Sequence, residues 1–229
     1  MFEMNEEIAR KVIDAVTPGL SEGLGKPIPG HMCVEAAVCY ALGLPHSDDP
    51  GCVESSVRSL KIALNDISQW SSNHARAKGM LRLAVAQLGS LGVVDGMIFS
   101  QMIAEMTIRN IVPIALRSVK GIAANQLILL ENAAVRCETE GSVESARATL
   151  AAALSSADAA GHAAYAARAA AAAAARAAAS LAADAAHYAA HAADYADKDS
   201  VLSLFAEEVV QILIALKSPG SEYLYLTEK

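Results

Sequence analysis

The amino-acid sequence predicts an all-α protein, a multi-helix bundle organised around a long alanine-rich helix. The first observation is an alanine tract, residues 145–196, which holds 31 alanines among 52 residues and no proline. Alanine is the strongest helix former because it loses no side-chain entropy and buries no polar atom in a helix. The second observation is composition: 54% of the 229 residues are hydrophobic but only 4% are aromatic, which favours helices over sheets. No segment alternates strictly enough to predict a strand.

The chain is predicted to form a single domain, 1–229. Its expected parts are an N-terminal helical part (1–140), an alanine-rich helix or helix pair (143–198), a C-terminal helix (199–217) and a tail (218–229). An unbroken helix over the alanine tract would be about 78 Å long, against a radius of gyration of about 17 Å for a compact chain of this size. The tract must therefore project as a rod or fold back, and Gly161 is the residue at which a break costs least.

Helical periodicity and capping residues divide the N-terminal part into successive helices. The expected helices cover residues 6–17, 31–42, 52–66, 73–88, 96–112 and 118–137. Asn5 and Asp95 have the short polar side chains that cap helix N-termini. Pro113 should kink or end the helix that follows Asp95, because proline lacks a backbone N–H and its ring clashes with the preceding turn.

Two of these segments carry further expectations. The helix at 31–42 is apolar nearly all round and should be buried, whereas the helix at 52–66 is amphipathic with Arg58 and Lys61 on its polar side. In the tail, tyrosine and leucine alternate over 223–226. Such a segment is too apolar to remain free in water, so we expect it to pack on this chain or on a second copy.

The charge balance and the cysteines narrow the classes of function. A formal net charge of −7 argues against a nucleic-acid partner, because binding to the phosphate backbone depends on clustered Lys and Arg. No membrane span is expected, since charged residues interrupt the most apolar stretch, 93–116. No signal peptide is recognised, and the four cysteines lack CxxC spacing, so reduced buried thiols in a cytoplasmic protein are expected.

The first candidate site is the loop around the single tryptophan and the helix start that follows it. Exposed backbone N–H groups at a helix start form an anion site, nearby basic side chains add positive charge, and an indole ring can stack on a base. The alternative is an ordinary capped helix with a solvated basic face. The residues of this candidate site are Trp70, Asn73, His74, Arg76 and Lys78, with Arg82 one turn further on.

The second candidate site is a polar stripe along the alanine tract. Its non-alanine residues recur with a mean step of about 3.6, so their side chains share one helix face. The residues proposed to contact an anionic, aromatic ligand are His162, Tyr165, Arg168 and Arg176. The alternative is a solvent-facing edge that keeps the alanine helix soluble.

No enzyme, metal site or cofactor is expected. His187 and His191 have the i, i+4 spacing of a metal-ligand pair, but no third ligand is identifiable. Cys33 lies near a helix start, which lowers a thiol pKa, yet no flanking signature supports a catalytic cysteine. GxGxxG, GxxxxGK[ST] and HExxH are all absent.

Several blocks give the chain a resemblance to a group of proteins. They are GHMCVEAAVCYALGLPHSDDPGCV (30–53), NDISQWSSNHARAKGMLRLAVAQLGS (65–90), the Ala/Tyr/His/Asp tract and LKSPGSEYL (216–224). With these the chain resembles uncharacterised alanine-rich proteins of bacteriophages and bacteria. The resemblance implies a phage-associated role, in which small proteins without enzyme motifs bind a host protein or sequester a defence signal. It assigns no activity or binding residue.

Together these observations predict a non-enzymatic protein that binds a small ligand. We expect a phage-type counter-defence sponge that sequesters a nucleotide-like anion at the basic and aromatic groupings described above. The alternative is a structural or protein-interaction module that forms a homo-oligomer through its alanine-rich helix. A homo-oligomer is expected in either case.

Overall fold

The computed structural model describes residues 4–117, 123–142, 144–145 and 197–228, and these residues form helices joined by loops. Within these ranges no strand is present, apart from an isolated antiparallel bridge between Gly25 and Met32. The all-α prediction is therefore confirmed for the described residues. The predicted alanine-rich helix lies outside them for nearly all of its length. The elements are α1 (Glu6–Val16), α2 (Val34–Ala41), α3 (Ser55–Asn65), α4 (Asn73–Ala86), α5 (Gly96–Met106), the π-helix η1 (Thr107–Ile111), α6 (Val112–Arg117), α7 (Ala124–Glu140), α11 (Lys198–Ala215) and the 3-10 helix η2 (Pro219–Thr227).

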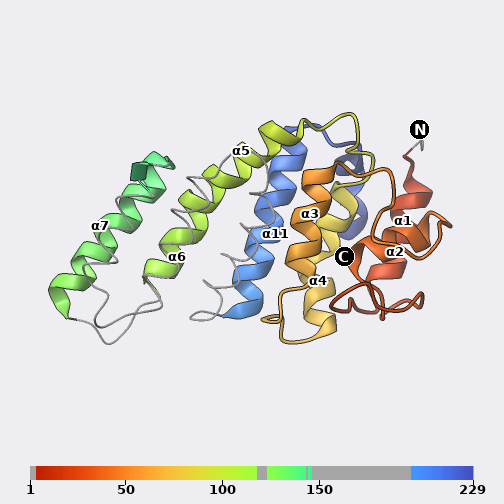
Figure 1. Cartoon of the computed structure of the whole chain (residues 1–229), viewed down its shortest axis with the longest axis horizontal. Helices are drawn as coiled ribbons and strands as arrows, with labels where there is room; N and C mark the ends of the chain where they lie inside the picture. Colours follow the sequence, from red (N-terminus) through yellow and green to blue (C-terminus); the bar gives the residue numbers. More distant parts are fainter. Residues whose placement is uncertain (1–3, 118–122, 143, 146–196, 229) are drawn as a thin grey trace.

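The centre of the described structure is the pair α4 and α11, which pack along each other (Figure 1). Helices α1 and α2 pack together on one side, and α1 also contacts α4. On the other side α5, η1 and α6 run on from one another, and α7 packs back on α6 and η1 (Figure 1). The core between these layers is almost wholly aliphatic, with Phe99 and Phe205 as its largest apolar side chains at 0% exposure.

Local capping chemistry explains where the helices begin. Asn5 accepts a hydrogen bond from the backbone N–H of Ile8 at 3.0 Å, as the sequence predicts for the start of α1. Asp95 likewise caps α5. The helices α2 and α3 begin a few residues later than their periodicity suggests, because Cys33 and Glu54 serve as the capping residues. Periodicity locates a helix, but the cap sets its first residue.

Pro113, predicted to kink or end the helix that follows Asp95, does not end it. Helical backbone runs from α5 through the π-helix η1 into α6, and Pro113 lies in the first turn of α6. In the widened turn, Val112 donates its backbone N–H to the carbonyl of Thr107, five residues back. This i→i−5 pattern replaces the regular ladder just before the proline, so the missing N–H and the ring are accommodated without ending the helix.

The tail packs on its own chain, one of the two outcomes expected for it. The 3-10 helix η2 lies against α4 and α1, and Leu224 is 6% exposed. Tyr223 donates its hydroxyl to the carbonyl of Met4 at 3.2 Å, which joins the two ends of the described chain. Among the described helices, none has the length and apolar character needed to cross a membrane.

Candidate functional site

A groove runs between α4 and α11 and contains part of the first candidate site. Its volume is about 610 Å³. Its floor is formed by small and aliphatic residues, among them Gly79 and Ala206, and its rim is polar. The polar residues that line this α4–α11 groove are Ser72, His74, Lys78, Arg82, Asp199, Ser200, Ser203 and Glu207.

Gly79 brings the two helices close enough to form the floor of the groove. A Cβ atom at this position would lie 2.5 Å from Cη2 of Trp70 and 2.6 Å from Oγ of Ser203. Glycine in the middle of a helix costs about 1 kcal/mol relative to alanine. The close approach of the Trp70 ring and of α11 accounts for the glycine.

Two residues of the first candidate site are buried beneath the groove and do not line it. Trp70 is 5% exposed, and its indole Nε1 donates to the carbonyl of Leu64 at 3.0 Å. Arg76 is also 5% exposed; its guanidinium donates to the carbonyl of Leu20 at 3.0 Å and to Oδ1 of Asn73 at 3.0 Å. Burial lowers the pKa of Arg76. Trp70 satisfies a carbonyl in the last turn of α3 and Arg76 one in the loop after α1, which in both cases is a structural task.

Lys78 and His74 are the open basic side chains of the groove. Both are exposed, and among the described residues neither has an ion-pair partner. Arg82 is engaged already, because its Nε donates to Glu207 at 2.9 Å and its Nη1 to Thr227 at 3.3 Å. The groove can therefore offer a small anion the ammonium group of Lys78 and the imidazole of His74 without first breaking an ion pair described here.

The groove has two internally satisfied acidic groups. Asp199 accepts a hydrogen bond from the backbone N–H of Ser71 at 3.0 Å and another from the Ser71 hydroxyl, which ties the start of α11 to the start of α4. Glu207 accepts from Arg82 and, at 2.8 Å, from Gln211. These carboxylates are therefore engaged within the protein.

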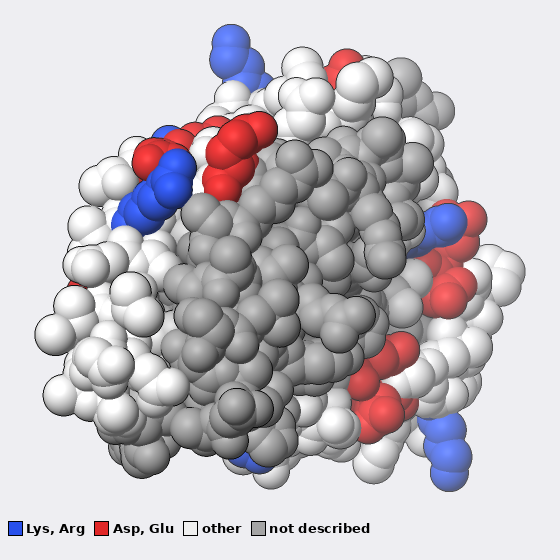
Figure 2. Space-filling view, turned by 60° about the vertical axis from the view of Figure 1, so that its left-hand side comes forward, with Lys and Arg blue, Asp and Glu red and all other residues white. Residues whose placement is uncertain are grey.

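The second candidate site cannot be placed. His162, Tyr165, Arg168 and Arg176 lie outside the described residues, as do His187 and His191. In the described part of the chain, no group of three or more His, Cys, Asp or Glu residues is arranged to hold a metal ion. Figure 2 shows one face of the molecule. On its described surface the Lys and Arg side chains are scattered and form no basic patch.

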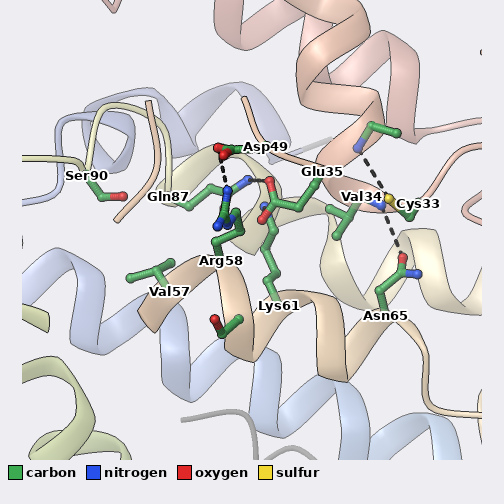
Figure 3. A network of polar contacts seen from close by, with 12 residues as sticks. Cys33, Val34, Glu35, Asp49, Val57, Arg58, Lys61, Asn65, Gln87 and Ser90 are labelled. Carbon is green, nitrogen blue, oxygen red and sulfur yellow. Dashed lines mark hydrogen bonds and ion pairs between the residues drawn. The ribbon is translucent and has the colours of Figure 1, made fainter. Parts of the chain in front are cut away.

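Sequence reasoning missed a buried polar cluster formed by Glu35 of α2, Lys61 of α3 and Gln87 after α4 (Figure 3). All three residues are 0% exposed. The Glu35 carboxylate lies between the other two: Lys61 Nζ is 3.1 Å from Oε1, and Gln87 Nε2 donates to Oε2 at 3.3 Å. Burial raises the pKa of Glu35 and lowers that of Lys61, and in each case the opposite charge of the partner acts against the shift.

The placement of Lys61 on the polar side of its helix is wrong. Lys61 lies on the buried stripe of α3 with Val57 and Leu64, four residues before it and three residues after it. This spacing is visible in the sequence, as is Glu35 alone among apolar residues in α2. The opposite charges at these two core positions were the available signal for a buried pair.

The same region contains a buried thiol and a buried amide. Cys33 Sγ accepts a hydrogen bond from the backbone N–H of Ala36 at 3.3 Å, and Asn65 Oδ1 accepts from that of Val34 at 3.2 Å (Figure 3). Burial raises the pKa of the Cys33 thiol. A raised pKa disfavours the thiolate, which is the nucleophilic form of cysteine.

Comparison of the chain with protein-family models, with curated proteins and with solved structures found no match.

Proposed function

We propose that the protein is a non-enzymatic binding protein that holds a small nucleotide-like anion in the α4–α11 groove. The observation that carries the proposal is the presence of two open basic side chains, Lys78 and His74, beside a groove of about 610 Å³. Pockets for small molecules have volumes of about 300–1,000 Å³. The groove has the size for one such ligand.

The charge of the whole chain favours a small anion over a polymeric one. A net charge of −7 repels an extended polyanion, whose binding sums many phosphate contacts. A mononucleotide or pyrophosphate needs only local contacts, and the hydroxyls of Ser72 and Ser203 can add neutral hydrogen bonds to those of the cations.

The sponge hypothesis adds the alanine-rich helix to this site. Arg168, Arg176 and Tyr165 would supply further cationic and aromatic contacts from the predicted stripe, and His162 would extend it. A sponge binds without turnover, which fits a sequence that contains no GxGxxG, GxxxxGK[ST] or HExxH motif. The resemblance to phage alanine-rich proteins supports a counter-defence role for that sequestration.

The test is calorimetric titration of the full chain with nucleoside mono- and diphosphates, cyclic nucleotides and inorganic pyrophosphate. At least one should bind, and Lys78→Ala should weaken binding about tenfold or more, since a hydrogen bond to a charged group contributes about 1.5–3 kcal/mol. His74→Ala should also weaken binding, because the imidazole N–H can donate a hydrogen bond to an anion. The matched control is Lys11→Ala, an exposed lysine on α1 that does not line the groove and pairs with Glu7.

The same titration decides against the proposal in two ways. No heat with any member of the panel would exclude a nucleotide-like ligand. Heat that both His74→Ala and Lys78→Ala leave unchanged would exclude the α4–α11 groove, and Arg168→Ala would then show whether the stripe is the site.

A protein-interaction module is the second candidate function. It is favoured by apolar side chains on α7, where Leu127, Ile128 and Val135 are 45%, 62% and 45% exposed. In this alternative the homo-oligomer forms through the alanine-rich helix together with these apolar side chains of α7. Measurement of the mass in solution separates the two: an assembly that dissociates in Ile128→Glu, without any ligand heat, supports the interaction module.

A further inference from the structure

The buried cluster of Glu35, Lys61 and Gln87 has more hydrogen-bonding capacity than its members satisfy among themselves. Three of its polar atoms are fully buried and have no hydrogen-bond partner among the described residues: Lys61 Nζ, Glu35 Oε1 and Gln87 Oε1. The 3.1 Å ion pair joins two of these atoms, but it lies outside hydrogen-bond alignment. The ion pair therefore supplies attraction between the charges without a directed bond.

Leaving these atoms unpaired would be costly. A buried donor or acceptor without a partner costs about 1–3 kcal/mol, and more when the group is charged. A buried ion pair offsets its desolvation only when further hydrogen bonds satisfy the remaining protons and lone pairs. The ammonium group of Lys61 has three N–H donors, and none is directed at a protein acceptor among the described residues.

These three unpaired atoms define the chemistry of a group that could bond all of them. It must accept a hydrogen bond from Lys61 Nζ and donate hydrogen bonds to Gln87 Oε1 and Glu35 Oε1. A metal cation would be repelled by the ammonium group, and an inorganic anion by the carboxylate. A small neutral molecule that both donates and accepts meets all three requirements.

We propose that the cluster encloses one ordered water molecule that bridges Lys61 Nζ to Gln87 Oε1 and Glu35 Oε1. Buried waters of this kind make about three hydrogen bonds to otherwise unsatisfied groups. The bridge links α2, α3 and the end of α4 through a single site, because each of its three protein partners comes from a different segment. It also explains how a charged pair persists at 0% exposure.

The orientation of the Gln87 amide supports this geometry. Nε2 donates to Oε2 of Glu35 at 3.3 Å, and the reversed amide would place two acceptor oxygens against each other while Glu35 is ionised. Oε1 of Gln87 therefore points away from the carboxylate and needs a donor of its own.

A crystal structure of the full chain at high resolution tests the proposal directly. One solvent peak is expected within hydrogen-bond distance of both Lys61 Nζ and Gln87 Oε1. Absence of the peak would overturn the proposal, whichever protein atom Lys61 Nζ then bonds. This measurement needs no variant, so it stands whether or not substitutions in the cluster fold.

Magnetic relaxation dispersion of ¹⁷O counts long-lived waters in solution and gives an independent readout. Gln87→Met removes the acceptor and should lower the count by one. Gln211→Met is the matched control, because Gln211 is an exposed glutamine on α11 whose amide bonds Glu207. An unchanged count in a folded Gln87→Met protein, or an equal loss in both variants, would contradict the proposal.

Discussion

At the scale of single residues, the position of Lys61 determines how the core can be altered. Its ammonium group and the Glu35 carboxylate are buried against each other, so removal of one leaves the other as an unpaired charge. Removal of both leaves no charge at all. Removal of one charge should therefore lower the free energy of unfolding much more than removal of both.

We predict that Lys61→Met lowers the free energy of unfolding by about 3–5 kcal/mol, since it strands a buried carboxylate. The double variant Glu35→Gln/Lys61→Met should recover most of this loss, because the introduced amide would still accept a hydrogen bond from Gln87 and no charge would remain buried. Urea denaturation of the two variants and the parent protein at neutral pH measures the difference. Equal destabilisation by the single and double variants would contradict the prediction.

The stability of Lys61→Met should also depend on pH with a defined sign. Burial raises the pKa of Glu35 in the folded protein, whereas the unfolded chain titrates near the ordinary glutamate pKa of about 4.3. Between the two pKa values the folded state binds the extra proton, so stability falls as pH rises through that window. Urea midpoints from pH 4 upward should therefore decline more steeply in Lys61→Met than in the double variant.

At the scale of elements, Arg109 joins two helices that are separated in sequence. It lies in η1 and donates to the carbonyls of Glu138 and Thr139, each at 2.9 Å, and to that of Glu140 at 3.0 Å. These belong to the last turn of α7, whose carbonyls have no partner within the helix. Gly141, which follows this turn, has a φ of 60°. Any other residue would place a Cβ atom 2.3 Å from Nε of Arg109, so a side chain at this position would clash with the arginine.

We predict that Arg109→Ala destabilises the end of α7 by about 1–2 kcal/mol, since it removes charge-assisted bonds from a partly exposed site. Hydrogen exchange of the Gly141 amide, which bonds the carbonyl of Cys137 at 2.9 Å, reports on this turn. Arg136→Ala is the control: Arg136 pairs with Glu140 on the same helix but on the surface. Its loss should cost about 0.3–0.5 kcal/mol. If both variants increase the exchange rate of the Gly141 amide by the same factor, the prediction is wrong.

These elements also show what a sequence can predict. Asn5 and Asp95 are caps that act within three residues, so their roles follow from local pattern alone. Arg109 acts on carbonyls about thirty residues away, and Trp70 became a candidate ligand contact because nothing local indicates that Leu64 would accept its N–H. Within the first candidate site, sequence reasoning named His74 and Lys78, which line the groove, but it could not tell them from the buried Trp70 and Arg76.

At the scale of the whole molecule, the end of the described chain is built into the core. The hydroxyl of Ser218 donates to the carbonyl of Ala86 at 2.6 Å, and the backbone N–H of Gly220 donates to that of Leu88 at 2.8 Å. A Cβ at Gly220 would lie 2.1 Å from the carbonyl oxygen of Val85. The tail is therefore held by backbone contacts with the end of α4 as well as by its apolar side chains.

We predict that Leu224→Ala lowers the free energy of unfolding by about 2–3 kcal/mol, because it leaves a cavity where a buried side chain packs. Tyr225→Phe should change it by less than about 0.5 kcal/mol. Tyr225 is the neighbouring tail residue and is 54% exposed, with a surface hydrogen bond to Glu6.

Urea denaturation followed by the fluorescence of Trp70 reports on the core, because the ring lies under α4 at Gly79. If the tail folds with the rest of the molecule, Leu224→Ala shifts the single unfolding transition to lower urea. If it only covers a finished core, the transition stays in place while the tail amides exchange faster.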